Sequence, residues 1–248
     1  MNAHIDAAPL ALRSIPPAPP IRLIHPMHAY RTMRQVIAEP DNVPMVAKLI
    51  ELLQGSGPWR VYRRMKWSQT GRAILAEQPD ILARLNDHAW LESLPANTLG
   101  ANYLRFMRDS KIDGDWFAAA VAKGRRMALG DDAPPPHFVE QWLRDTHDLY
   151  HVVTGWGSDV LGELAVLAFT FAQTRNFSAL VISTSGCMAL RKERSDVGQI
   201  YRRAMWQGMR ARVLHTQDWM SLIDQPLEEV RRQLNIVPAP AYEHMYAD

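Results

Sequence analysis

The sequence predicts an all-α fold, organised as a single-domain helical bundle. Apolar residues recur at helical spacing along most of the chain from Pro26 onward. No two segments show the alternation that would mark a pair of β-strands. Residues 160–172 are apolar almost all round, which is typical of the buried centre of a bundle.

Composition narrows the functional classes. The chain has 248 residues, 47% of them hydrophobic, so it can bury one large core. A formal net charge of +2 gives no reason to expect a nucleic acid partner. The single cysteine, Cys187, excludes an internal disulfide and a cysteine-based zinc site, and we expect it to be a small buried residue. No run of 18 apolar residues exists, so no membrane-spanning helix is predicted.

Two regions differ in composition. Residues 1–25 are rich in proline and alanine, and we expect a disordered arm there. Residues 26–248 are expected to form the single helical domain. The first residues resemble neither a secretory signal nor a good mitochondrial transit peptide, because they lack a long apolar run and have few basic residues.

The expected helices follow from apolar periodicity and from glycine and proline breaks. In the first half they cover residues 45–53, 71–78, 79–85 (with proline in its first turn) and 101–108, with breaks at 55–58, 94–100 and 131–136. In the second half they cover residues 138–154, 160–172, 176–190, 195–219 and 227–234. Segment 176–190 has a strand-like stretch, but an isolated strand would lack a partner, so a helix is expected. Gly155 and Gly157 end the helix over 138–154, and Ser158 is the expected N-cap of the next helix, with Asp159 in its first turn.

The chemistry of the chain is expected at His147-Asp148-Leu149-Tyr150-His151. Residues four apart lie on one helix face, roughly 6 Å apart at Cβ, so the two imidazoles can bind one metal ion. Asp148 is offset by about 100° around the helix, and can either reach the same ion or orient an imidazole from behind. Tyr150 is a candidate proton donor, although core packing is its more common role.

Glu163 adds a second carboxylate from the following helix. Its neighbours Val160, Leu161, Leu164 and Val166 are apolar, so its burial would be costly unless it binds a metal or a partner. An antiparallel turn at 155–158 would bring Glu163 level with His151, which makes a metal-binding helical hairpin the centre of the bundle. Four ligands without sulfur suit zinc, iron or manganese, and the sequence does not choose among them. Two histidines four apart also occur on many helices without a metal, so the two carboxylates are needed for this prediction.

The sequence His147-Asp148-x-x-His151, eleven residues and Glu163 resembles the H-D-x-x-H-(11)-E signature of the coenzyme Q (ubiquinone) biosynthesis protein 4 family. The resemblance extends over roughly residues 27–236. It includes the segments Gly71–Leu75, Leu94–Tyr103, Gly162-Glu163, Trp206–Gly208 and Pro226–Leu234. One departure is Asp145, where the family tends to have glutamate two residues before the first histidine.

The resemblance implies a mostly helical fold and a role in ubiquinone biosynthesis. It also implies one divalent metal ion held by His147, Asp148, His151 and Glu163, and oxidative decarboxylation of a polyprenylated hydroxybenzoate precursor, with hydroxylation at C1. The implied partners are the prenylated precursor lipid, other ubiquinone-biosynthesis proteins and a peripheral membrane surface, with a homodimer as a further expectation. Without a good leader, the chain is expected to be bacterial, and cytoplasmic or peripheral on the inner membrane.

Three alternatives stay open from the sequence. In the first, the metal is structural and the protein is a non-catalytic scaffold that binds the lipid precursor. In the second, His-Asp marks a metal-dependent phosphohydrolase, which would need further ligands such as His88, His137 or His215. The third concerns a basic cluster that is either a solvated helix face or a surface for anionic lipid; its residues are Arg191, Lys192, Arg194, Arg202, Arg203, Arg210 and Arg212. For Trp206 and Trp219 the sequence leaves two places open, the protein core and the interface with a membrane.

Overall fold

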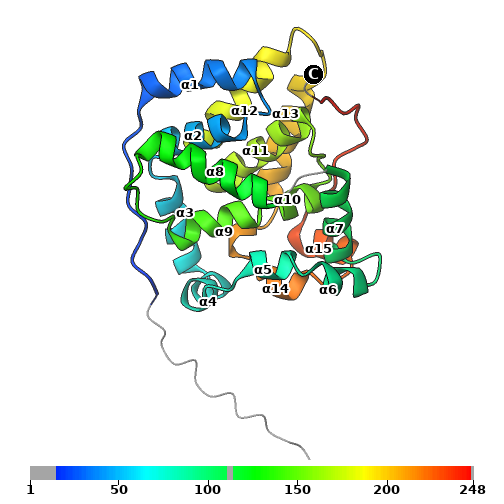
Figure 1. Ribbon diagram of the computed structural model, residues 1–248. Helices are drawn as coiled ribbons and strands as arrows, with labels where there is room; N and C mark the ends of the chain where they lie inside the picture. Colours follow the sequence, from blue (N-terminus) through cyan, green and yellow to red (C-terminus); the bar gives the residue numbers. More distant parts are fainter. Residues whose placement is uncertain (1–14, 111–113, 247–248) are drawn as a thin grey trace, which may run out of the picture.

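Helices make up the regular secondary structure of this computed structural model, which describes residues 15–110 and 114–246 (Figure 1). Within these residues no strand is present, and a single β-bridge joins Thr98 to Pro226, which confirms the all-α fold class. The helices of the first half are α1 (Pro26–Ala38), α2 (Val43–Leu53), α3 (Gly57–Trp67), α4 (Gln69–Glu77), α5 (Ile81–Leu85), α6 (His88–Ser93), α7 (Leu99–Ser110) and α8 (Gly114–Leu129).

The second half holds the elements on which the site is built. These are α9 (Phe138–Asp145), α10 (His147–Thr154), α11 (Val160–Thr174), α12 (Phe177–Leu190), α13 (Val197–Arg210), the 3-10 helix η1 (Leu214–Thr216), α14 (Trp219–Leu222) and α15 (Leu227–Leu234). Segment 176–190 is therefore a helix, as expected, with the Asn176 side chain accepting a hydrogen bond from the Ser178 N–H at its start.

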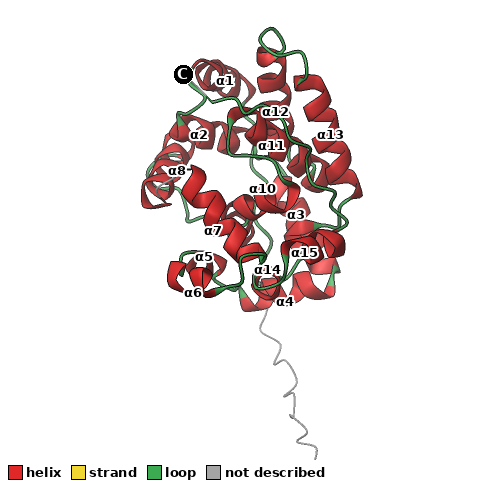
Figure 2. Cartoon of the chain, turned by 90° about the vertical axis from the view of Figure 1, so that its right-hand side faces the viewer, coloured by secondary structure: helices red, strands yellow, loops and turns green. Residues whose placement is uncertain are grey.

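Helix α11 lies in the middle of the bundle and packs against α12 and α13. Helix α2 packs against α1 and α8 on one side of this centre (Figures 1 and 2). The short helices α4, α5, α6, α14 and α15 gather at the end of the molecule away from α1 and α12 in both views. Because α11 is apolar on nearly every face, it can be enclosed in this way, and Val166, Ala168 and Phe169 are fully buried.

The helix predicted over 138–154 is wrong in one respect, because it is interrupted at Thr146. The Thr146 hydroxyl, completely buried, donates to the Trp142 carbonyl at 2.7 Å, a local bond that bends helices. Helix α9 therefore ends at Asp145, and His147 becomes the first residue of α10. This break sets the direction of the ligand-bearing helix independently of α9.

Two predicted helix starts are shifted. The N-cap of α11 is Asp159, whose carboxylate accepts from the Leu161 N–H at 3.2 Å, and not Ser158. Pro79 lies before the N-cap Asp80 of α5 and not in its first turn. In both cases the aspartate carboxylate is the stronger acceptor for the free N–H groups at a helix start.

The long helix predicted over 195–219 is also wrong. Helix α13 ends at Arg210, because Ala211 is extended and the backbone N–H groups that follow donate hydrogen bonds to other segments instead of to the helix. The Arg212 N–H donates to the Leu234 carbonyl, and the Leu214 N–H donates to the Gln173 side chain at 2.9 Å. Tertiary hydrogen bonds of this kind cannot be read from periodicity along one segment.

Three further expectations concern single residues. Trp219 is fully buried and belongs to the core, whereas Trp206 is 51% exposed and lies under the Arg210 guanidinium. Cys187 is half-buried, and burial raises the pKa of its thiol to about 11, so it is a poor nucleophile.

The expected arm over residues 1–25 is described only from residue 15. Residues 15–25 have no regular secondary structure, and they run along the bundle, with the Arg22 N–H donating to the Gly55 carbonyl. The Arg22 guanidinium pairs with Glu51 and Glu140, and Arg125 pairs with the same two carboxylates. No helix in the described part of the chain is both long enough and apolar enough to cross a membrane.

His215 is expected to make the protein less stable as the pH falls. It is completely buried in η1 with both ring nitrogens unpaired, and burial together with the charge of Arg64 lowers its pKa to about 3. Below pH 6.5 the unfolded chain takes up a proton that the folded chain does not, so the free energy of unfolding falls by up to about 1.4 kcal/mol per pH unit. Urea unfolding at several pH values should show a shallower pH dependence for His215→Met; identical slopes would contradict this assignment.

Candidate metal centre

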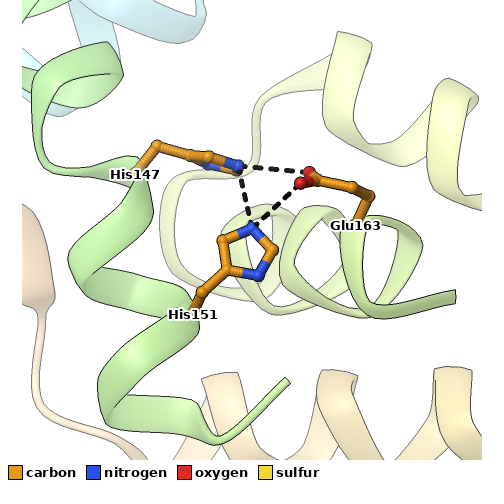
Figure 3. A group of neighbouring side chains, drawn as sticks. All are labelled: His147, His151 and Glu163. Carbon is orange, nitrogen blue, oxygen red and sulfur yellow. Dashed lines mark hydrogen bonds and ion pairs between the residues drawn. The ribbon is translucent and has the colours of Figure 1, made fainter. Parts of the chain in front are cut away.

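The site is formed where the start of α11 passes the first turns of α10. His147 is the first residue of α10, His151 lies one turn later, and Glu163 is in the first turn of α11. The left-handed Gly155 (φ +77°) ends α10 and allows the chain to turn back toward α11. The predicted hairpin is therefore present, and it brings the three side chains together (Figure 3).

The three side chains present their ligand atoms to one point. The Nε2 atoms of His147 and His151 are 3.2 Å apart, and the Glu163 carboxylate lies 3.3 Å from the first and 3.4 Å from the second. Figure 3 shows these contacts as a triangle, with both imidazoles pointing away from α10 toward Glu163. Such a group of ligand atoms, all within 4.8 Å of one another, is a suitable frame for one ion.

Backbone carbonyls fix the ring of His151. Its Nδ1–H donates to the carbonyls of Trp156 (3.1 Å) and Gly157 (2.9 Å), and the Phe106 ring stacks on the imidazole with centroids 5.2 Å apart. Because the proton is held on Nδ1, Nε2 has a lone pair facing Glu163 in the neutral ring. A metal-binding histidine has this arrangement, with a carbonyl behind it and the ion in front.

Electrostatics in the triad favour opposite charges when it holds no metal. Burial lowers the pKa of His151, but the Glu163 carboxylate more than offsets this and raises it to about 9. Partial burial alone would raise the pKa of Glu163, and the two neighbouring imidazoles instead hold it well below its usual range. A divalent cation would replace the imidazolium proton as the charge that balances Glu163.

The site is closed on the His151 side and open on the other. His151 has no exposed side-chain surface, whereas 29% of the His147 side chain and 43% of the Glu163 side chain are exposed. The expectation that apolar neighbours bury Glu163 is therefore wrong. Leu161, Leu164 and Val166 are buried, whereas Glu163 lies on the partly exposed side of α11, which it shares with Val160 three residues earlier.

The residues present fit a divalent ion. Two imidazole nitrogens and one carboxylate are a frequent ligand set for Fe²⁺ and are equally suited to Zn²⁺ or Mn²⁺. The tautomer of His151 is set correctly for binding, and the exposed edges of His147 and Glu163 leave room for further ligands.

Comparison with known proteins gives the family. The model of the family "Coenzyme Q (ubiquinone) biosynthesis protein Coq4" matches residues 27–240. The chain belongs to the Coq4 family. Membership indicates a role in ubiquinone biosynthesis, as the resemblance implied.

Relatives and a solved structure agree with this assignment. The chain is 31% identical over 205 residues to the mitochondrial ubiquinone biosynthesis protein COQ4 homolog of Aedes aegypti, covering 81% of this chain and 71% of that protein. It is 30% identical to the homolog of Danio rerio, covering 82% and 73%. A crystal structure of a candidate ubiquinone biosynthesis protein from Nostoc punctiforme has the same fold, with a TM-score of 0.61 at 22% identity, over 86% of this chain and 98% of that chain.

Asp148, the fourth predicted ligand, is not in the group of converging ligand atoms among the described residues. Burial raises its pKa, against the lowering effect of His147 and His151, and its charge in turn adds to the effect of burial on the phenol of Tyr103, whose pKa is raised. Asp148 therefore lies beside the triad and near Tyr103, and its binding to a metal stays a prediction. Asp145, the departure from the Coq4 family pattern, accepts a hydrogen bond from Arg144 at 2.8 Å.

The other predicted candidates lie elsewhere. Tyr150 is fully buried and packs against Phe169 and Trp219, so its role is in the core. His88 is exposed on α6, His137 caps the start of α9, and His215 is buried in η1. None of these three histidines joins the converging group in the described residues, so they do not supply the further ligands that the phosphohydrolase reading needs.

Sequence reasoning missed the residues that hold α10 in place. The Arg231 guanidinium donates to the carbonyls of Val152 (2.9 Å) and Val153 (3.0 Å), where the helix leaves its last carbonyls unpaired. Gln207 donates to the Thr154 carbonyl and accepts from the Trp156 indole N–H. Both residues fall in segments that resemble the Coq4 family, so that pattern was the available signal for them.

Proposed function

We propose that this Coq4 family member catalyses the metal-dependent oxidative decarboxylation of a polyprenylated hydroxybenzoate precursor, replacing the C1 carboxylate with a hydroxyl group. The supporting observation is the convergence of His147, His151 and Glu163 on one point with one side open. A ligand set with open positions is typical of a catalytic metal, whereas structural metal sites are closed by protein ligands.

A bound ion would supply Lewis-acid and redox chemistry at this point. The proposed conversion is a net oxidation that releases carbon dioxide, so it requires an oxidant, for which dioxygen is suitable. Zinc has no redox chemistry, so the proposal favours iron or manganese.

The protein's own residues would orient the substrate and accept or hold a proton. The opening beside His147 and Glu163 admits the carboxylate end of the substrate, and Phe106 closes the far side against the His151 ring. Asp148, with its raised pKa, is the proposed orienting base, and it remains a candidate fourth ligand.

An open groove between α12 and α13 suits a ligand with apolar and anionic parts. It has a volume of about 460 Å³ and lies between α12 and α13, where Met188 and Cys187 supply apolar surface and Arg191 and Arg202 supply positive charge. Gly186, next to Cys187, packs against Leu164, the residue after Glu163.

We propose that the partners of the protein are the prenylated lipid, other biosynthesis proteins and the surface of a membrane. A bacterial origin, a cytoplasmic or peripheral inner-membrane location and a homodimer also stay predictions.

The proposed reaction is tested with purified protein and a short-chain prenylated hydroxybenzoate labelled at its carboxyl carbon. With Fe²⁺ or Mn²⁺ and dioxygen, the expected result is release of labelled carbon dioxide together with a hydroxylated product. Glu163→Gln removes one charged ligand atom and should abolish both. Binding of the precursor without any conversion would instead support the scaffold with a structural metal and would contradict the enzyme.

A further inference from the structure

We propose that Tyr242 is a positioning residue of the metal centre, which links the ligand His151 to the buried carboxylate of Asp159 through a single peptide group. The inference rests on the proposed metal centre. Tyr242 lies in the C-terminal tail, 79 residues after Glu163 in the sequence, and comes next to the site only in the folded chain.

The link is a continuous series of hydrogen bonds. The His151 Nδ1–H donates to two carbonyls, that of Gly157 at 2.9 Å and that of Trp156 at 3.1 Å, and the link runs through the Trp156 carbonyl. The N–H of the same peptide group, which belongs to Gly157, donates to the Tyr242 hydroxyl at 3.0 Å. That hydroxyl donates to the Asp159 carboxylate at 2.5 Å. The histidine, the peptide, the phenol and the carboxylate therefore form one chain of donors and acceptors.

The direction of these bonds makes them mutually reinforcing. In a planar trans peptide the C=O and the N–H point in opposite directions, so a hydrogen bond at one end polarises the other. The Asp159 side chain is completely buried, and its charge attracts the phenol proton at the end of the series. The Trp156 carbonyl becomes a better acceptor, and the Nδ1–H of His151 is held more firmly. A carboxylate bonded directly to a metal-binding histidine acts in the same way at shorter range.

The tail that carries Tyr242 is held against the loop between α10 and α11 and the start of α11. The Met245 N–H donates to Asp159 at 3.0 Å, and the Met245 carbonyl accepts from the Val160 N–H at 2.8 Å. The Tyr242 ring packs against Trp156 and stacks on His244 with centroids 4.9 Å apart. Residues 242–245 follow the last residue matched by the Coq4 family model, so this support lies outside the family pattern.

The test is Tyr242→Phe in the full chain, which keeps the ring and removes only the hydroxyl. Two properties are measured: the affinity for Zn²⁺ by competition with a chelator, and the Nδ1–H proton resonance of His151 by NMR, with and without Zn²⁺. We expect roughly tenfold weaker Zn²⁺ binding, in the range seen for outer partners of metal ligands. The Nδ1–H resonance should move and exchange faster with solvent.

The matched control is Tyr62→Phe. Tyr62 is buried, whereas Tyr242 is half-buried, and the Tyr62 hydroxyl donates to the Pro16 carbonyl at 2.8 Å, away from the site. It should lose a comparable amount of stability and leave both measured properties unchanged. Equal effects of the two variants on Zn²⁺ affinity would mean that Tyr242 is merely structural.

Asp159→Asn is the second variant, because asparagine keeps the cap at the start of α11 and removes the charge. It should weaken Zn²⁺ binding in the same direction as Tyr242→Phe. Unchanged affinity and an unchanged Nδ1–H resonance in both variants would overturn the link. If the wild-type protein binds neither Zn²⁺ nor Mn²⁺, the proposed metal centre is wrong, and the resonance in the metal-free protein alone decides whether Tyr242 positions His151.

Discussion

Replacing His147 with alanine is expected to weaken divalent metal binding by more than about 100-fold, because even partners outside the ligand shell contribute 10- to 100-fold. His147 supplies one of three converging ligand atoms. It begins α10 and is partly exposed, so its removal should leave the core and the free energy of unfolding almost unchanged. Isothermal titration with Mn²⁺ or Zn²⁺ measures the loss.

The matched control for this variant is His88→Ala, which removes an exposed histidine near the start of another helix. It should bind the metal as the wild type does. Glu163→Gln should behave like His147→Ala, since a neutral amide keeps the size of the side chain and loses its charge. Wild-type affinity in both His147→Ala and Glu163→Gln would show that the ion binds elsewhere.

A single methyl group at Gly162 is expected to disrupt the site and the fold together. A Cβ atom there would lie 2.0 Å from the Gly157 carbonyl oxygen and 2.8 Å from the Tyr242 hydroxyl. The loop that orients His151 would have to move, since the first contact is with backbone. We expect Gly162→Ala to lower the free energy of unfolding by about 3 kcal/mol, the upper part of the usual range for overpacking, and to weaken metal binding at least about tenfold.

Gly198→Ala is the corresponding control. Gly198 lies in the first turn of α13, and a Cβ there would meet only the Arg202 guanidinium at 3.6 Å, an ordinary contact. Alanine is the better helix former, so this variant should be as stable as the wild type or more stable by up to about 1 kcal/mol. Urea unfolding of the two variants provides the comparison. Wild-type stability and metal affinity in Gly162→Ala would contradict the prediction, because the loop would then accommodate the added methyl group.

Much of the fold and of the site could be predicted because the signals are local. The apolar period identifies α11, and the two histidines of α10 are four residues apart on one face. Gly155 marks the turn between α10 and α11. A charge inside an apolar helix then indicates that Glu163 faces the same point, and the structure agrees with this inference although the side chain is half exposed.

The remaining features depend on contacts between distant segments. Nothing within residues 195–219 shows that Arg212 and Leu214 bond to Leu234 and Gln173, which ends α13 early. The break at Thr146 depends on a hydroxyl that could equally have faced solvent. Tyr242 approaches the site only because the tail crosses the loop at Gly157, and no periodicity in the sequence of the tail predicts this contact.

Anomalous diffraction from crystals grown with Mn²⁺ or Zn²⁺ would test the central claim most directly. The predicted result is one peak at a distance of about 2.0–2.3 Å from Nε2 of both His147 and His151 and from a carboxylate oxygen of Glu163. An ion at full occupancy elsewhere in the protein, with His147, His151 and Glu163 in contact only with one another, would contradict the assignment of the metal centre.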